Sequence, residues 1–184
     1  MVDFLARAHP DKFAELIKGL KGITNAEGYA DGSDLPGELP SLVAPLERGE
    51  ADLVIGSRVL GHAEPGALTL PQRFGNHLAA FLLRALWGAS TTDLGPFRAI
   101  RWDALEGLGM ADPDYGWTVE MQVKALRAGL ITREVPVTYR RRIGVSKISG
   151  TVRGVVGAGT KILWTIARAA AARGRVVGSR PPAD

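Results

Sequence analysis

The sequence predicts an α/β domain in which short apolar strands alternate with amphipathic helices, and three observations predict this class. Residues 52–58 (DLVIGSR) form a continuous apolar run that ends in polar residues, which is typical of a buried parallel strand. Apolar residues recur with helical spacing over about 71–87 and again over 118–128. Residues 135–139 alternate as a strand does, and Pro136 suggests that this strand lies at an edge of the sheet.

Helices and loops are expected between these strands. In chain order they are a helix over 1–22, a turn over 31–37, a short amphipathic helix over 38–48, a loop over 59–69, a strand over 97–101, a short helix over 103–109 and a long helix over 150–172. In the helix that begins near Pro71, one apolar stripe consists of Phe74, Leu78, Phe81, Leu82, Ala85 and Leu86.

Composition excludes several classes of protein. The chain has 184 residues, of which 46% are apolar and 23% charged, and this fits one compact domain better than a disordered segment. The absence of cysteine excludes disulfides and a cysteine nucleophile, and His9, His62 and His77 lack the spacing of a zinc site. No apolar run has the length of a membrane span, and the first residues do not resemble a secretory signal. We therefore expect a cytoplasmic protein.

The net charge of +4 combines two unlike parts. Residues 133–184 contain 11 Lys and Arg against 2 Asp and Glu, whereas residues 1–132 contain 12 against 17. The basic part favours an anionic partner, either a membrane surface, a phosphate-bearing substrate or nucleic acid. Nucleic acid is the weakest of these because the basic segment lacks interleaved aromatic residues. The alternative is a solvated basic face.

The helix expected over 150–172 is amphipathic. On a helical wheel its apolar arc consists of Val152, Val155, Val156, Ile162, Leu163 and Ile166, and the opposite side carries Arg153, Lys161, Trp164 and Arg168. A basic helix with a tryptophan of this kind can lie on an anionic bilayer. The alternative is a helix that packs on its own domain and keeps its basic side in water, and the sequence leaves both open.

The segment 139–147 (YRRRIGVSK) is the strongest local signal for a binding site. Three arginines follow a strand, a glycine permits a tight turn, and Ser-Lys come next. Arginine presents a planar fork to phosphate oxygens and lysine adds a mobile charge, so an anion site is favoured over a solvated loop. Arg58 and Arg98 each lie at a strand end, where an anion clamp and a surface ion pair are both plausible.

Two carboxylates are candidates for chemistry. Asp31 lies in a turn where it could help to hold a divalent cation against a diphosphate, although Asp-Gly-Ser is also an ordinary turn. Glu120 lies in the first turn of a helix, where the helix dipole keeps a carboxylate ionised. It could accept a proton or position a phosphate-bound metal. An ordinary i, i+4 pair with Lys124 is the alternative for Glu120.

Five ordered blocks carry a resemblance to a known family: DLVIGSR (52–58), LPQRFGN (70–76), TDLGPFRAI (92–100), YGWTVEMQVKA (115–125) and VPVTYRRRIGVSKISGTVRG (135–154). They resemble the family 2 glycosyltransferases, especially the polyprenyl-phosphate sugar synthases of the dolichyl-phosphate mannose synthase type. The resemblance covers about residues 30–170. It implies a partial A-type glycosyltransferase (Rossmann-like) fold, a nucleotide-sugar donor and a polyprenyl phosphate acceptor. It also implies a peripheral location at the inner face of the cell membrane.

The resemblance also implies roles for single residues. The phosphate- and acceptor-binding candidates are Arg58, Arg98, Arg140, Arg142, Ser146 and Lys147, of which the last three match an Arg-x-x-x-Ser-Lys element that handles phosphate groups. Glu120 matches an acidic position near the sugar and the acceptor, and it is the candidate catalytic residue. Asp31 matches the second Asp of a metal-binding Asp-x-Asp motif, which implies Mg²⁺ or Mn²⁺.

Two departures from the family pattern limit these expectations. Tyr29 occupies the position of the first metal-binding Asp, and the strand–helix repeats that normally hold the nucleotide are missing from the first 29 residues. We therefore expect a divergent helical segment over 1–29, the acceptor-side half of a glycosyltransferase over 30–172 and a disordered basic tail over 173–184.

Two functional hypotheses follow from these departures. The first is a glycosyltransferase-family protein whose independent activity is doubtful, because that activity is lost, shared with a separate chain or hidden by a misassigned start. The second is a non-catalytic peripheral membrane module that binds lipid phosphates through residues 140–147 and the basic helix. An exposed sheet edge would in addition favour self-association.

Overall fold

The computed structural model describes residues 32–112, 116–143 and 152–171. Its centre is a three-stranded sheet with the order β2-β1-β3. Strand β1 (Leu53–Ala63) lies in the middle, β3 (Thr132–Tyr139) pairs with it in parallel, and β2 (Arg98–Ile100) pairs with it in antiparallel orientation. The prediction of an α/β class is therefore confirmed. So is the edge position of the strand that contains Pro136, within the residues described.

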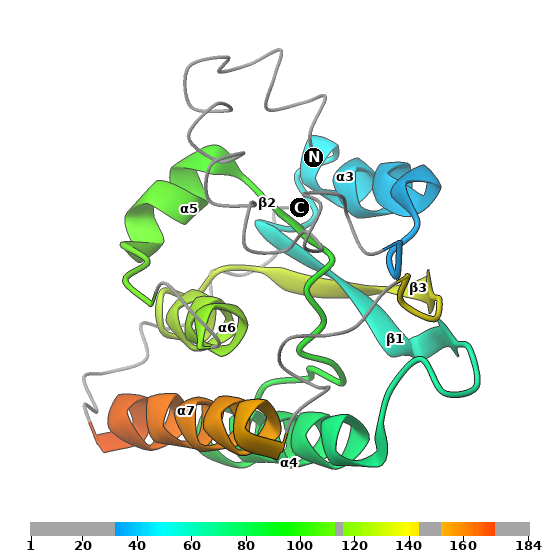
Figure 1. The fold of residues 1–184 in the computed structure, drawn as a ribbon. Helices are drawn as coiled ribbons and strands as arrows, with labels where there is room; N and C mark the ends of the chain where they lie inside the picture. Colours follow the sequence, from blue (N-terminus) through cyan, green and yellow to red (C-terminus); the bar gives the residue numbers. More distant parts are fainter. Residues whose placement is uncertain (1–31, 113–115, 144–151, 172–184) are drawn as a thin grey trace.

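Helices cover the sheet in layers (Figure 1). Helix α3 (Leu39–Glu47), which follows a short 3-10 turn η1 (Pro36–Glu38), packs on one face around Leu42 and Val54. Helices α5 (Trp102–Leu108) and α6 (Trp117–Arg127) cover the other face around Ile55 and Met121. Beyond α6 lies an outer layer of α4 (Leu70–Trp87) and α7 (Val152–Ala171). The helices predicted over 38–48, 103–109 and 118–128 are thus confirmed to within two residues.

Strand β1 is longer than the sequence predicts. It continues to Ala63, so that the loop expected over 59–69 begins later. The pairing with β3 is interrupted between Ser57 and His62, where the register shifts. Gly61 lies inside this irregularity so close to the backbone of Val137 that a Cβ atom would collide with it. Glycine thus permits the strand to resume beyond the bulge, which a count of apolar residues does not detect.

Helix α4 has well-formed ends but buries a different side from the predicted stripe. Thr69 and Gln72 form a reciprocal capping box at its start, and Gly88 ends it with a φ of 68°. Its buried residues are Ala79, Ala80 and Leu83. Phe74 and Phe81, which belong to the predicted stripe, are 70% and 64% exposed. Apolar residues lie on nearly every side of this helix, so spacing alone could not identify the side that faces α6 and α7.

Helix α7 confirms the helix predicted over 150–172, but the wheel misplaces two side chains. Ile162 and Ile166 pack inward as expected. Lys161, which was assigned to the water-facing basic side, instead pairs with Asp112 at 3.1 Å, and Leu163 of the apolar arc is exposed. The helix lies beside α4 and α6, and these neighbours, rather than hydropathy alone, set its rotation. Within the described ranges we find no helix with the length and apolarity that crossing a membrane requires.

Several predictions concern residues outside the part of the chain that the structure describes. These are the helix over 1–22, the turn around Asp31 with Tyr29, the positions of Ser146 and Lys147, and the tail over 173–184.

Candidate phosphate-binding site

Arg58, in the middle of β1, is held by Asp93 from the loop that leads into β2. Its Nε and Nη2 atoms donate to the two carboxylate oxygens of Asp93 at 2.8 and 2.6 Å, and its backbone N–H donates to the same carboxylate at 2.8 Å. Burial opposes the charge of Arg58, but the contacts with Asp93 outweigh it and raise the pKa of Arg58 above its ordinary value. The guanidinium carbon lies 5.0 Å from the ring centre of Tyr139. Arg58 is thus a charged group fixed in one orientation.

The loop that carries Asp93 is gathered around the carboxylate of Glu134 on β3. Glu134 accepts hydrogen bonds from the backbone N–H groups of Thr92 and Asp93 and from the hydroxyls of Thr91 and Thr92, at 2.7–3.1 Å. A buried loop needs partners for its backbone groups, and a carboxylate with several donors supplies them. Glu134 therefore positions Asp93, which in turn positions Arg58.

Helices α4 and α6 hold the same loop from two other sides. Asn76 of α4 donates to the carbonyl of Thr92 at 3.2 Å and accepts from the N–H of Leu94 at 2.8 Å. Gln122 of α6 donates to the carbonyl of Asp93 at 3.0 Å. The loop therefore has one well-determined conformation, although it contains no regular secondary structure.

A cavity of about 310 Å³ lies between the second half of β1 and the first turns of α4. Its polar lining is mostly cationic or titratable and includes Arg58, His62, Arg73 and His77. Among these lining residues, all in the described part of the chain, the only carboxylate is Asp93, whose charge is matched by Arg58. Nδ1 of His77 lies 2.7 Å from the carbonyl oxygen of Arg73. The cavity therefore offers a net positive environment for an anion of the size of a phosphate group.

Arg98, the first residue of β2, lies in the interior. It is 3% exposed, and its guanidinium donates to the carbonyl of Gly95 at 2.6 and 3.1 Å and to the carbonyl of Thr118 at 3.0 Å. Burial lowers the pKa of Arg98 to about 10, which leaves it charged at neutral pH. These contacts tie the loop before β2 to the first turn of α6. The predicted contact of Arg98 with phosphate stays a prediction.

Glu120 lies in the first turn of α6, as the sequence predicts. Its carboxylate pairs with Lys124 at 2.9 Å, the alternative that the i, i+4 spacing suggested, and accepts from the backbone N–H groups of Ala111 and Asp112. Burial opposes ionisation, but these donors outweigh it and lower the pKa of Glu120 below its ordinary value. Glu120 is therefore ionised at neutral pH, and its predicted catalytic role stays a prediction.

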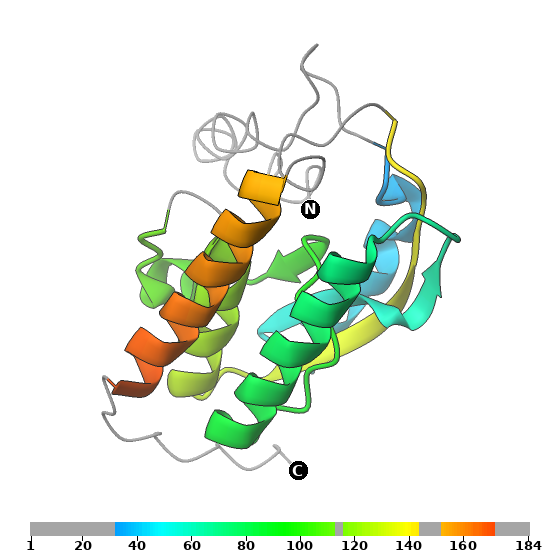
Figure 2. The same cartoon turned by 60° about the horizontal axis from the view of Figure 1, so that its bottom comes forward.

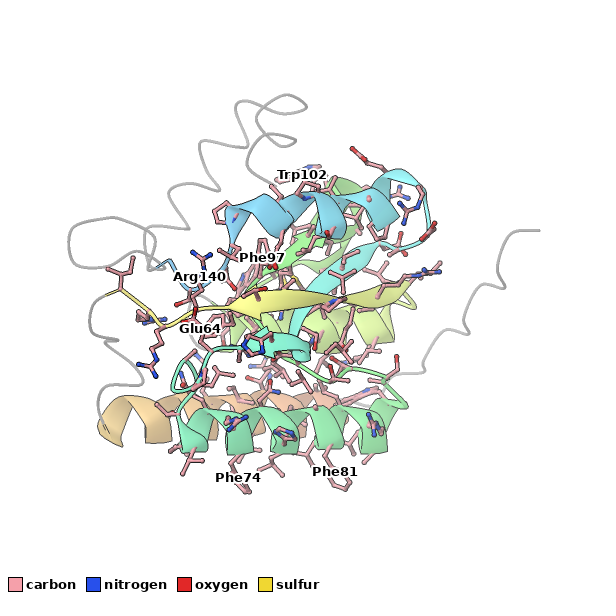
Figure 3. All side chains as sticks on the ribbon, turned by 90° about the vertical axis from the view of Figure 1, so that its right-hand side faces the viewer. Glu64, Phe74, Phe81, Phe97, Trp102 and Arg140 are labelled. Carbon is pink, nitrogen blue, oxygen red and sulfur yellow. The ribbon has the colours of Figure 1, made fainter. Side chains whose placement is uncertain are left out.

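The basic segment follows β3 at the same end of the sheet as the loop after β1. Arg140, Arg141 and Arg142 are exposed, and Figure 3 shows Arg140 and Glu64 at this end. The backbone N–H of Arg141 donates to Glu64 at 2.9 Å, and its Nε donates to the carbonyl of Pro65 at 2.6 Å. The parallel pairing of β1 with β3 brings these segments together, which agrees with the predicted placement of polar groups at strand ends.

The predicted metal ligand is not among the residues that the structure describes, since Asp31 precedes them. Within residues 32–112, 116–143 and 152–171, no three His, Asp or Glu side chains converge as a metal site requires. We assign no metal ligand in these ranges and derive no step through a metal.

Sequence reasoning missed several residues of the site. Arg73, Asn76, His62 and His77 were not singled out, although the first two lie in the block 70–76. Asp93 and Glu134 look like ordinary polar residues in the sequence. Only the fold shows that Arg58, Asp93 and Glu134 act together.

Comparison with known proteins supplies relatives for this chain. Over 130 residues it is 39% identical to uncharacterised glycosyltransferases of Mycobacterium bovis and Mycobacterium tuberculosis, which is 69% of this chain and 57% of each relative. It is 33% identical over 133 residues to an undecaprenyl-phosphate mannosyltransferase of Micrococcus luteus, covering 70% of this chain and 53% of that protein. A low-salt glycan biosynthesis hexosyltransferase of Haloferax volcanii is 31% identical over 113 residues, which is 60% of this chain and 27% of that protein.

No protein-family model and no solved structure matches the chain. The named relatives that the chain resembles are all glycosyltransferases. More narrowly, their names support a family 2 glycosyltransferase similar to the polyprenyl-phosphate sugar transferases. It spans a little over half the length of the first relatives that it matches.

Proposed function

We propose that this chain forms the acceptor-side part of a glycosyltransferase that transfers a hexose from a nucleotide sugar to a polyprenyl phosphate. The observation that carries the proposal is the cationic cavity between β1 and α4, which is lined by Arg58 and Arg73. The printed names of two relatives, an undecaprenyl-phosphate mannosyltransferase and a hexosyltransferase, support this substrate class. The proposal includes a fold that is part of an A-type glycosyltransferase fold.

The chemistry requires an acceptor phosphate held in a fixed position. A phosphate oxygen attacks the anomeric carbon, the bond from that carbon to the nucleoside diphosphate breaks, and the diphosphate leaves with the electron pair. Arg58 is oriented in advance by Asp93, so it can bind a phosphate oxygen with little loss of side-chain freedom. Arg73 supplies further donors at the same cavity, which His62 and His77 also line.

Several predicted features remain part of the proposal. Arg140, Arg142, Ser146 and Lys147 are proposed to handle phosphate groups, as the family resemblance implies. Mg²⁺ or Mn²⁺ at Asp31 and a peripheral location at the inner face of the membrane are proposed on the same ground.

The proposal is tested by acceptor binding, followed by transfer. We expect the chain to bind a short, water-soluble isoprenyl phosphate in a calorimetric titration, and Arg73→Ala to weaken binding about tenfold, because it removes one charge-assisted contact. Arg101→Ala is the matched control, since Arg101 pairs with Asp103 at the surface and does not line the cavity. Equal binding by both variants, or none by the wild type, contradicts the proposal. Labelled UDP- and GDP-hexoses then show which donor, if any, supplies sugar to the acceptor.

A further inference from the structure

A second cavity lies where the C-terminal ends of α4 and α6 meet the start of β3 (Figure 2). Its volume is about 560 Å³, which is larger than that of the cationic cavity, and residues 88–92 and 132–134 form much of its lining. We call it the α6–β3 cavity. Thr91 and Thr92 line it, whereas Asp93 lines the cationic cavity, so the loop 91–93 contributes to both. The proposed function does not use the α6–β3 cavity.

Two residues that line this cavity each carry a buried oxygen without a hydrogen-bond partner among the residues that the structure describes. These oxygens are Oε1 of Gln122 and Oγ1 of Thr132. Gln122 is only 2% exposed, and its Nε2 donates to Oγ1 of Thr91 at 3.2 Å and to the carbonyl of Asp93 at 3.0 Å. These donations fix which end of the amide is the acceptor. A buried acceptor without a partner costs free energy, so both oxygens are suited to a donor from outside the fold.

The charge in the lining of the cavity is negative. Glu134 lines it, and the partners of this carboxylate within the described ranges are all neutral, namely backbone N–H groups and threonine hydroxyls. Among the lining residues, all of which are described, Arg133 is the only cation. It pairs with Glu50 at 3.2 Å, and its side chain is 55% exposed. The lining therefore contains a carboxylate that no cation within it neutralises.

Two helices add to this negative character, because both end at the cavity. Helix α4 ends at Trp87 and α6 ends at Arg127, and Gly88 and Leu126 line the cavity. The C-terminal end of a helix carries a partial negative charge, which favours a cation nearby. None of the basic residues in the last turns of these two helices lines the cavity. The helix ends and Glu134 thus favour the same sign of ligand charge.

Part of the lining is apolar, since Leu60, Leu126 and Leu130 contribute to it. Acceptors for a positive donor and aliphatic side chains for a hydrocarbon therefore lie in one cavity. An ammonium group supplies three donors and a positive charge, whereas a hydroxyl supplies one donor and no charge. An ammonium group on an aliphatic chain is the complement of this lining.

We propose that the α6–β3 cavity binds an alkylammonium ion. Gln122 and Thr132 accept hydrogen bonds from the ammonium group, Glu134 attracts its charge, and the leucines contact the hydrocarbon. The ammonium group belongs either to a free alkylamine or to a lysine side chain of another protein, and its chemistry is the same in both. This inference goes beyond the proposed function, which assigns the phosphate acceptor to the cationic cavity.

The first experiment is a calorimetric titration of the full chain with n-hexylamine, with Nα-acetyl-lysine methylamide and with n-hexanol. We expect hexylamine to bind about tenfold more tightly than hexanol, because its hydrogen bonds are charge-assisted. Tighter binding of hexylamine than of the lysine derivative assigns the site to a free alkylamine, and the reverse order assigns it to a lysine side chain. Equal binding of hexylamine and hexanol overturns the proposal. So does binding of neither ammonium probe, which would leave the two oxygens to water.

The variant Thr132→Val locates the site. Valine has nearly the shape of threonine but lacks the hydroxyl, so hexylamine should bind about tenfold more weakly. Because Oγ1 of Thr132 has no partner among the described residues, the urea midpoint of this variant should be no lower than that of the wild type. Thr132→Ser keeps the hydroxyl and is the matched control, which should bind hexylamine like the wild type. Unchanged binding by Thr132→Val overturns the proposal. A lower urea midpoint also overturns it, because the hydroxyl would then have a partner within the fold.

The same variant separates this inference from the proposed function. Thr132 does not line the cationic cavity, so Thr132→Val should bind the soluble isoprenyl phosphate like the wild type. Equal weakening of both ligands would mean that the two cavities are not separate sites, and it overturns the inference. Titration with an amine needs no phosphate acceptor, so its failure counts against the alkylammonium site alone. Failure of the wild type to bind the isoprenyl phosphate counts against the proposed function alone.

Discussion

Two regions of this molecule reverse the usual distribution of side chains. Around the loop 91–93, charged groups lie inside: Asp93 is fully buried, Arg98 is nearly so, and Glu134 is surrounded by donors. On the outer layer of α4 and α7, aromatic groups lie outside, with Phe74 and Trp164 largely exposed. Both arrangements cost free energy relative to apolar residues inside and polar residues outside.

The two regions differ in how this cost is offset. Within the loop region, each carboxylate is matched by donors from the fold, so its charges are compensated internally. Nothing within the described residues covers Phe74 or Phe81 to the same extent. The buried charges therefore contribute to folding and to the geometry of the site, whereas the exposed aromatic residues contribute little to the stability of the fold. Substitutions in the two regions should therefore affect different properties.

Asp93→Asn should have the largest effect on stability. It removes the countercharge of Arg58, whose side chain is only 12% exposed, and leaves a nearly buried guanidinium without a carboxylate. We expect the free energy of unfolding to fall by about 3–5 kcal/mol, measured by urea denaturation. Asp103→Asn is the control, because its pair with Arg101 is exposed to solvent and should contribute little to stability. Similar losses of unfolding free energy in both variants would show that the buried pair stabilises the fold no more than the exposed pair does.

The second prediction concerns the inward side of the helix that carries the aromatic residues. Leu83→Ala should lower the free energy of unfolding by about 2–4 kcal/mol, because Leu83 is fully buried among α4, α6 and α7. Leu86→Ala on the same helix is the matched control, and its cost should be below about 1 kcal/mol because Leu86 is exposed. The pair is measured by thermal and urea unfolding. A larger loss for Leu86→Ala would mean that the outward side of α4 is covered after all.

The sequence was sufficient for the parts of the fold that depend on local pattern. The apolar run of β1, the edge position of Pro136 and the ends of α5 and α6 all follow from neighbouring residues. It was not sufficient for the rotation of α4, because apolar residues surround that helix. Which side is buried was decided by α6 and α7, which are distant in sequence.

The candidate site could be predicted only in part, again because much of it depends on contacts between residues that are distant in sequence. Arg140 follows from the basic pattern after a strand. Arg58 was expected at a strand end, but it lies in the middle of β1 because that strand continues to Ala63. Asp93 and Arg58, which are in contact, lie 35 positions apart in the sequence. Glu134 lies more than 40 positions from the loop residues that it contacts. No local spacing in the sequence indicates such contacts, because the donors around a buried carboxylate come from segments that meet only in the folded structure.

The third prediction addresses a carboxylate at the border between the two regions. The pKa of Glu120 is lowered in the folded state, so Glu120 stabilises the fold above its unfolded pKa of about 4.3, and this contribution is lost as the pH falls through the lower folded pKa. Glu120→Gln should cost about 1–2 kcal/mol at pH 7, and stability should fall less steeply below about pH 4.5 than in the wild type. Urea midpoints across this range check both expectations. Parallel pH profiles would exclude a contribution from Glu120.

The smallest expected effect on stability is that of Phe81→Ser. Most of the Phe81 side chain is already in water, so its removal should change the free energy of unfolding by only about 0.5 kcal/mol in either direction. The measurement is urea denaturation. A loss above about 2 kcal/mol would mean that Phe81 is a core residue and would remove the contrast between the two regions. An unchanged stability would instead separate the outward side of this helix from its inward side, since Leu83, two positions away, is fully buried.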